Sequence, residues 1–143
     1  MGQISDCVNR LAASATFAMM QKSNELAAQG VNVVNMSVGE PDFNTPDYVK
    51  TAAKQAIDDN YSTYSPVPGY MSLRKACSDK LKRENNLDYA PTQIVVSTGA
   101  KQSLCNAIMA VVNPGDEVLL PSPCWVSYPE MVKLAGGVPV VIK

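Results

Sequence analysis

The chain has 143 residues, of which 46% are hydrophobic and 17% are charged, a composition typical of globular proteins. Twelve Lys and Arg against thirteen Asp and Glu leave a net charge of -1, which argues against a polyelectrolyte attraction to nucleic acid or an anionic membrane surface. With no histidine and no CxxC pair among Cys7, Cys77, Cys105 and Cys124, no metal site is expected.

The first third of the chain predicts two helices separated by a short strand and a loop. The first helix is expected over 16–29, because Gly30 follows in the place of a C-terminal stop. Residues 31–36 alternate valine and asparagine, which indicates a strand, and 37–45 form a loop. Thr45-Pro46-Asp47 then combines a capping hydroxyl, a proline at the first helical position and an acid in the first turn. The helix that follows should present an apolar face made of Val49, Ala52, Ala53 and Ala56.

The middle of the chain predicts a connection and a third helix. Residues 60–69 are rich in proline, serine and tyrosine, which is typical of a loop. A helix is expected over 71–83, with Leu73, Ala76, Cys77 and Leu81 facing inward.

The last third alternates strands and helices. Strands are predicted over 93–97, 117–120 and 138–142, and helices over 102–112 and 126–134. A turn at 113–116 precedes the second strand, and two glycines end the last helix. This order predicts an α/β fold in which crossovers join parallel strands. Three parallel strands alone would leave long apolar edges unpaired, so further sequence or other chains are expected to complete the sheet.

The segment from Ile94 to Gln102 is a candidate anion site. A strand ends in a Gly turn and a helix begins directly after it, so free N–H groups and the helix dipole point at one place. Gly99 allows close approach of a ligand, Thr98 offers a hydroxyl, and Lys101 adds charge. The alternative is a purely structural turn, and the spacing is not that of a P-loop.

Three further features are candidates for ligand contacts. Trp125 follows a strand, at the edge where open α/β sheets bind ligands, and its indole can stack on a flat ring or simply pack in a core. Gly39, in a turn-rich loop, can present its N–H to a carboxylate. Tyr61, Tyr64 and Tyr70 lie in the connection before the third helix, where any of them could reach a phosphate or merely pack. Ser14 and Thr16 are expected to cap the first helix, or alternatively to line a substrate entrance.

Five motifs in register resemble the class I/II aminotransferases, and most closely the aspartate aminotransferase branch of bacteria. They are Val38-Gly-Glu-Pro-Asp-Phe43, Tyr64-Ser-Pro-Val-Pro-Gly69, Ser97-Thr-Gly-Ala-Lys-Gln102, Asn113-Pro-Gly-Asp-Glu117 and Pro123-Cys-Trp-Val-Ser-Tyr-Pro129. The resemblance implies the N-terminal portion of the fold type I transferase fold of enzymes dependent on pyridoxal phosphate (PLP), whose large domain has three α/β/α layers. It implies that 1–45 contributes to the small domain and the substrate loop, and that 46–143 begins the large domain.

The same resemblance implies roles for individual residues. The backbone of Gly99, Ala100 and Lys101 would hold the phosphate of pyridoxal 5′-phosphate, and Trp125 would stack on its ring and border the substrate. Gly39 would contact the α-carboxylate of the substrate. Tyr64 would reach the phosphate bound by the neighbouring subunit of a homodimer.

The implied activity is the transfer of an amino group from an amino acid, with aspartate favoured, to a 2-oxo acid. The family's Schiff-base lysine lies beyond residue 143 in this resemblance, so the chain alone is expected to be inactive. Alternatives are another fold type I enzyme, such as a C–S lyase or an aminocyclopropane-carboxylate synthase, or a short non-catalytic protein that binds a phosphorylated ligand. A cytoplasmic location is expected, because the N-terminus lacks a signal-peptide layout and the apolar run 107–112 is too short to cross a bilayer.

Overall fold

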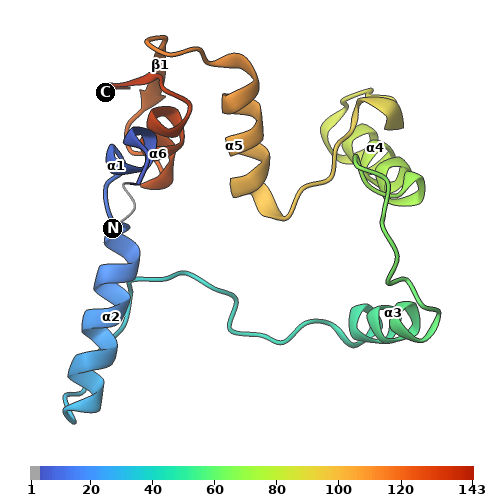
Figure 1. Cartoon of the computed structure of the whole chain (residues 1–143). Helices are drawn as coiled ribbons and strands as arrows, with labels where there is room; N and C mark the ends of the chain where they lie inside the picture. Colours follow the sequence, from blue (N-terminus) through green and yellow to red (C-terminus); the bar gives the residue numbers. More distant parts are fainter. Residues whose placement is uncertain (1–3) are drawn as a thin grey trace. The chain divides into compact units, whose positions relative to one another are not determined.

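The computed structural model describes residues 4–143, whose helices and strands are drawn in Figure 1. They divide into two compact units, 4–40 with 104–143, and 41–103. The elements in chain order are α1 (Asp6–Asn9), α2 (Ala15–Ala28), α3 (Asp47–Asp58), α4 (Met71–Asn85), the 3-10 helix η1 (Pro91–Gln93), α5 (Gly99–Val111), β1 (Glu117–Pro121), α6 (Ser127–Leu134) and β2 (Val138–Ile142). None of the helices in the described part is long and apolar enough to span a bilayer. The domain division at residue 45 stays a prediction.

The first unit is built around a β1–α6–β2 motif. The two strands pair in parallel over five residues each, from Glu117 opposite Val138 to Pro121 opposite Ile142. Helix α6 connects them and packs on both strands. Leu120 from β1 and Met131 and Val132 from α6 form the buried core, and Val132 has no exposed surface. The predicted parallel crossover and its two strands are therefore confirmed.

The N-terminal segment is attached to this motif through α6. The Ala12 N–H donates to the Glu130 carboxylate at 2.8 Å, and α1 packs against α6. The Ser14 hydroxyl accepts from the Phe17 N–H at 3.5 Å and so caps α2, as predicted.

The strand predicted over 31–36 is wrong. These residues have no ladder partner in the part of the chain that the structure describes, and Val34 and Met36 are exposed. An alternating pattern becomes a strand only when a neighbouring strand accepts and donates its backbone hydrogen bonds.

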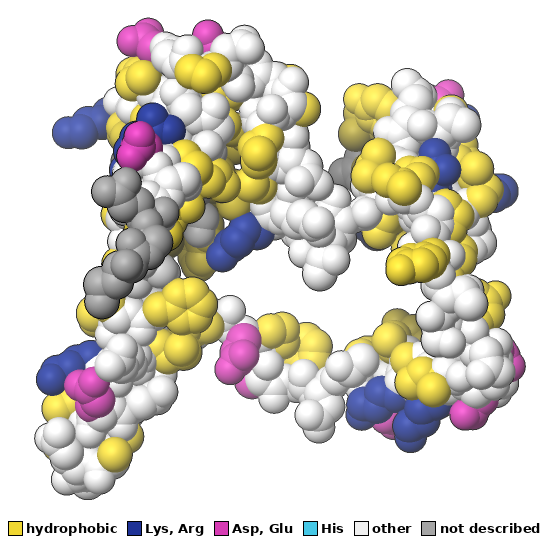
Figure 2. Space-filling view, viewed as in Figure 1, with side chains coloured by type: hydrophobic (Ala, Val, Ile, Leu, Met, Phe, Trp, Pro, Cys, Tyr) yellow, Lys and Arg dark blue, Asp and Glu magenta, His cyan; other side chains and the backbone are white. Residues whose placement is uncertain are grey.

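In the second unit, the predicted helix is present as α3, but it begins at Asp47, one residue after the predicted first helical position, and without the expected cap. Pro46 occupies the capping position, and no side chain bonds to the free N–H groups, so the Thr45 hydroxyl does not cap the helix. No residue of α3 is buried, so its apolar face lies uncovered within residues 4–143. Figure 2 shows hydrophobic side chains on the visible surface of each unit.

Helix α4 confirms the predicted helix but turns a different side inward. Leu73 and Ala76 are exposed and Cys77 and Leu81 half-buried, whereas Arg74 is the buried residue of the helix. The inward face was predicted from apolar spacing alone, which cannot anticipate an arginine bonded to a neighbouring backbone.

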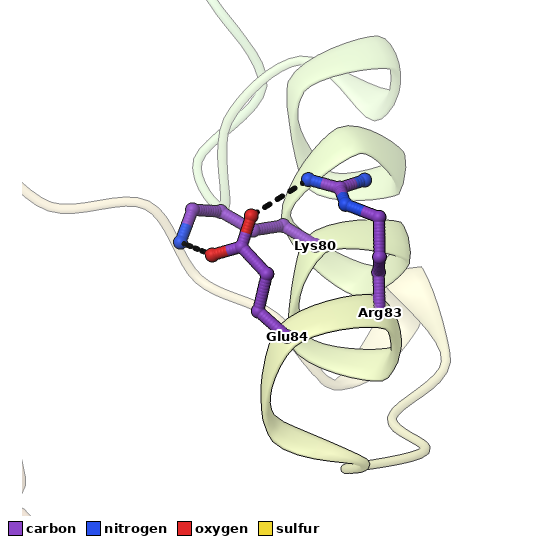
Figure 3. Close-up of polar contacts among 3 residues, drawn as sticks. All are labelled: Lys80, Arg83 and Glu84. Atoms are coloured by element: carbon purple, nitrogen blue, oxygen red, sulfur yellow. Dashed lines mark hydrogen bonds and ion pairs between the residues drawn. The ribbon is translucent and has the colours of Figure 1, made fainter.

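A surface cluster marks the solvent side of α4. Glu84 accepts hydrogen bonds from Lys80 and Arg83, and these contacts hold the pKa of its carboxyl below the usual value, with Lys80 contributing most (Figure 3). All three side chains are exposed, so the cluster is expected to add little to stability.

The strand predicted over 93–97 is also wrong. Its first residue ends η1, and Ile94 to Ser97 run without a partner strand. Helix α5 follows and begins at Gly99, three residues before the predicted start, so the predicted Gly turn forms the first turn of the helix.

Candidate cofactor and substrate site

The N-terminus of α5 leaves backbone N–H groups unbonded at the turn where the sequence predicts an anion site, and anion binding there stays a prediction. Gly99 has φ of +82° and donates its own N–H to the Ser97 carbonyl at 2.8 Å. The N–H groups of Ala100 and Lys101 have no acceptor within residues 4–143. The Thr98 N–H is bonded to the Gln102 side chain at 2.5 Å. Two backbone donors at the start of a thirteen-residue helix are therefore available to a ligand.

This turn borders a hollow of about 300 Å³ in the second unit. Hydroxyl and amide side chains line one part of it: Ser65, Ser97, Thr98 and Gln102. Apolar groups, including Val67, Leu73 and Val96, line the rest. The structure thus brings the 65–70 connection and the Gly99 turn to a common hollow, which the sequence alone did not predict.

The three loop tyrosines take different positions. Tyr61 and Tyr70 pack edge to face, with ring centroids 5.8 Å apart and planes at 68°. Tyr64 is fully exposed and does not line the hollow. Tyr70 also lines the hollow, whereas Tyr61 does not. The reach of the Tyr64 hydroxyl to a phosphate stays a prediction.

Trp125 and Gly39 lie in the first unit. Trp125 follows the carboxyl end of β1, is 50% exposed, and its carbonyl accepts the Tyr128 N–H that begins α6. It is thus not a buried core residue of this unit. Gly39 is exposed, and a Cβ at this position would have no heavy atom within 4 Å. The roles of both residues toward ring and carboxylate stay predictions.

A second hollow, of about 410 Å³, lies between α2 and the segment 34–37. Thr16 lines it together with Met19, Ser23, Val34, Met36 and Ser37. Of the two residues expected either to cap α2 or to line an entrance, Ser14 is the cap and Thr16 faces this hollow.

The residues of the α5 turn fit a phosphate ester. Its two available N–H donors suit phosphate oxygens, and the exposed Lys101 ammonium adds positive charge without an ion pair in the described part of the chain. Among residues 4–143, no carboxylate pairs with these donors. Within residues 4–143 no cluster of His, Cys, Asp or Glu is arranged to hold a metal ion, and the four cysteines are free and half-buried.

Two contacts near the turn were not predicted from the sequence. Gln102 bonds the Thr98 N–H, and Arg74 donates to the Ile94 carbonyl upstream of the turn. A glutamine in a first helical turn is a familiar capping signal, so the contact of Gln102 with the Thr98 N–H could have been predicted from the sequence. Arg74 carries no such signal, because an arginine in a helix is usually solvated.

Comparison with known proteins identifies the family. The family model for aminotransferases of class I and II matches residues 31–143. The aspartate/prephenate aminotransferase of Cereibacter sphaeroides is 51% identical over 142 residues, which cover 99% of this chain and 36% of that protein. The aspartate aminotransferase of Bacillus sp. is 46% identical, over 95% of this chain and 35% of its own length.

Solved structures give the same result. The aspartate aminotransferase of Thermus thermophilus with maleate superimposes with a TM-score of 0.94 at 46% identity, over 99% of this chain and 37% of that one. The enzyme of Thermotoga maritima has a TM-score of 0.89 at 37% identity. The chain therefore spans about a third of the length of the relatives it matches.

Proposed function

Because this chain belongs to the class I and II aminotransferases, whose cofactor is pyridoxal 5′-phosphate, we propose that it forms the phosphate-binding and ring-stacking part of an aminotransferase site. The observation that carries the proposal is the pair of unbonded N–H groups at the start of α5. They occur at the turn to which the resemblance assigns the cofactor phosphate.

Each predicted site residue has one task in this proposal. The N–H groups of Ala100 and Lys101 bind the phosphate, and the positive φ of Gly99 turns the chain so that both point the same way. The Trp125 indole packs on the face of the cofactor ring and excludes water from it. The Gly39 N–H binds the α-carboxylate of the substrate, and the Tyr64 hydroxyl donates to the phosphate in a partner subunit. The bound cofactor supplies the electron sink for chemistry at the substrate Cα.

The proposed reaction moves an amino group from an amino acid to a 2-oxo acid. Aspartate is the proposed donor, since it is named for relatives of this chain, and prephenate, itself a 2-oxo acid, is a proposed partner substrate because several relatives are named for both. We also propose that the family's cofactor-linked lysine lies outside residues 1–143, and that these residues by themselves do not turn over substrate.

The proposal extends to assembly and location. A homodimer is supported by the full exposure of Tyr64, whose proposed task requires a neighbouring subunit. A cytoplasmic location is supported by the four free cysteines of the described part.

The test is a titration of the native gene product with pyridoxal 5′-phosphate, followed by absorbance, and an assay with aspartate and 2-oxoglutarate. We expect saturable binding and transfer of the amino group by a gene product that carries the cofactor-linked lysine, and no transfer by residues 1–143 alone. Tyr64→Phe should speed loss of cofactor during dialysis, and Trp125→Leu should loosen the ring and slow turnover, both without unfolding the protein. Binding without transfer, together with elimination of a thiol or formation of a cyclopropane product, would favour the other fold type I enzymes. No binding at all would reject the proposal.

A further inference from the structure

We propose that Arg74 is a positioning residue for the phosphate turn: the Nε–H of its largely buried side chain fixes the backbone that delivers Gly99, Ala100 and Lys101 to the phosphate. The inference rests on the function proposed above and adds a residue that does not touch the cofactor.

The first observation is the burial of Arg74. Its side chain lies on α4, and the residue is only 8% exposed, the buried charged residue of the described part. Removing a guanidinium from water is costly unless it is hydrogen-bonded. Its Nε donates to the Ile94 carbonyl at 2.9 Å. A charged donor on a carbonyl is a stronger contact than a neutral pair, so Ile94 is held firmly.

The second observation is that the same segment is held by the turn before α4. The Val96 N–H donates to the Pro68 carbonyl at 3.0 Å. Gly69 lies so close that a Cβ there would stand 3.0 Å from Val96 Cβ. Ile94 is thus fixed by a side chain and Val96 by backbone, only a few residues before Gly99.

These contacts substitute for a strand ladder. The segment from Ile94 to Ser97 pairs with no strand in the described residues, so little else fixes its direction. The direction of this segment sets where the N–H groups of Ala100 and Lys101 point. Errors of about 1 Å in such placement reduce binding and rate strongly. Arg74 therefore acts on the phosphate through the backbone.

The helix offers a matched control one turn away. The Ser78 hydroxyl donates to the Tyr89 carbonyl at 2.6 Å, again from α4 to the chain that leads toward the turn. Tyr89 lies ten residues before Gly99, whereas Ile94, which Arg74 contacts, lies five residues before it. Ser78→Ala should therefore loosen the packing of α4 without misplacing the phosphate turn.

The test compares two ligands that differ only in the phosphate. Affinities for pyridoxal 5′-phosphate and for pyridoxal are measured in the native gene product and in Arg74→Met, Arg74→Lys and Ser78→Ala. We expect Arg74→Met to lower the ratio of the two affinities on the order of tenfold, because only the phosphate-dependent part is lost. Arg74→Lys should recover part of the ratio, since its ammonium can still donate to Ile94. Ser78→Ala should leave the ratio unchanged.

Several outcomes would overturn the inference. If Arg74→Met left the ratio of the two affinities unchanged, or if Ser78→Ala lowered it equally, Arg74 would contribute only to the general packing of α4. If Arg74→Met does not fold, Arg74→Lys decides: a native ratio together with native stability would contradict the positioning role, and a lowered ratio would support it. If the native protein does not bind pyridoxal 5′-phosphate, the proposed function itself is rejected. If the native protein binds normally and the Arg74 variants have the same ratio of the two affinities, only the positioning role of Arg74 is rejected.

Discussion

Strand β1 and the segment 94–97 differ in how their backbones are held, although both are rich in branched apolar residues. β1 pairs with β2 over its whole length, and Leu120 is buried under α6. Residues 94–97 have no partner strand in the described part, and Val95 is 66% exposed. They are held instead by the Arg74 side chain and the Pro68 carbonyl.

The difference shows that branched side chains favour an extended backbone but do not by themselves make a sheet. β1 is a strand because α6 returns the chain to lie beside it and supplies β2. In the second unit no such return occurs within residues 41–103, so the extended backbone is fixed by donors from a helix and a turn. The N–H groups of Ala100 and Lys101 beyond this segment are unbonded because they lie in the first turn of α5.

The largest test of this comparison is Leu120→Ala against Val95→Ala in the 143-residue chain. Leu120→Ala removes buried methyl groups between β1 and α6 and should lower the free energy of unfolding by about 2–5 kcal/mol. Val95→Ala removes exposed groups and should change it by less than about 0.5 kcal/mol. Urea denaturation measures both. A comparable loss at Val95 would show that 94–97 is packed in a sheet, and the comparison would be wrong.

A second test compares the glycine that precedes the paired strand β2 with the glycine that precedes the unpaired segment 31–36. Gly137 leads into β2, and a Cβ there would lie 2.7 Å from Val112 Cγ1 and 3.1 Å from the Asp116 carbonyl oxygen. Gly137→Ala should therefore cost about 1–3 kcal/mol through overpacking. Gly30 leads into 31–36 with open space around it but with φ of +81°, so Gly30→Ala should cost about 1 kcal/mol through backbone strain alone.

The two glycine variants should also respond differently to a compensating change. Val112→Ala makes room for the new methyl group, so it should reduce the cost of Gly137→Ala while leaving that of Gly30→Ala unaltered. Unfolding of the three single and two double variants measures this. If Val112→Ala changed the costs of the two glycine substitutions equally, Gly137 would be required for its backbone conformation rather than because a side chain does not fit there.

The smallest effect concerns how α6 holds the N-terminal segment. Glu130 accepts from Lys133 Nζ at 2.8 Å and from the Ala12 N–H, and these bonds, Lys133 first, hold the pKa of Glu130 below its ordinary value of 4.5. A lowered carboxyl pKa in the folded state stabilises the fold above the unfolded value and is lost as pH falls through the folded value. Glu130→Gln should thus cost about 0.5–1 kcal/mol near pH 7 and progressively less below pH 4.5.

Glu84→Gln serves as the matched control for that experiment. Glu84 also has a lowered pKa, from Lys80 and then Arg83, but it is solvent-exposed and ties no distant segment. Its replacement should change the pH dependence of unfolding less than Glu130→Gln does. A larger effect at Glu84 would indicate that the exposed cluster, rather than the Ala12 contact, governs stability in acid.

The sequence by itself determined the local elements of this protein, because local signals specify them. The helices α2 to α6 to within three residues of their ends, the Asn113–Asp116 turn and the β1–α6–β2 order follow from capping residues, glycines and periodicity. The Gly99 turn was found in the same way, since a strand-like run, a glycine and a helix adjoin in sequence. The family followed from motifs spread along the whole chain.

Only the tertiary structure decided which extended segments pair and which side chains turn inward. Whether 31–36 or 94–97 becomes a strand depends on a neighbour distant in sequence, and no local pattern reports whether one is present. The burial of Arg74 likewise depends on the Ile94 carbonyl, twenty residues away along the chain. Hydrogen bonds of this kind join groups that become close only on folding, so the turn itself was predictable and the contacts that hold it were not.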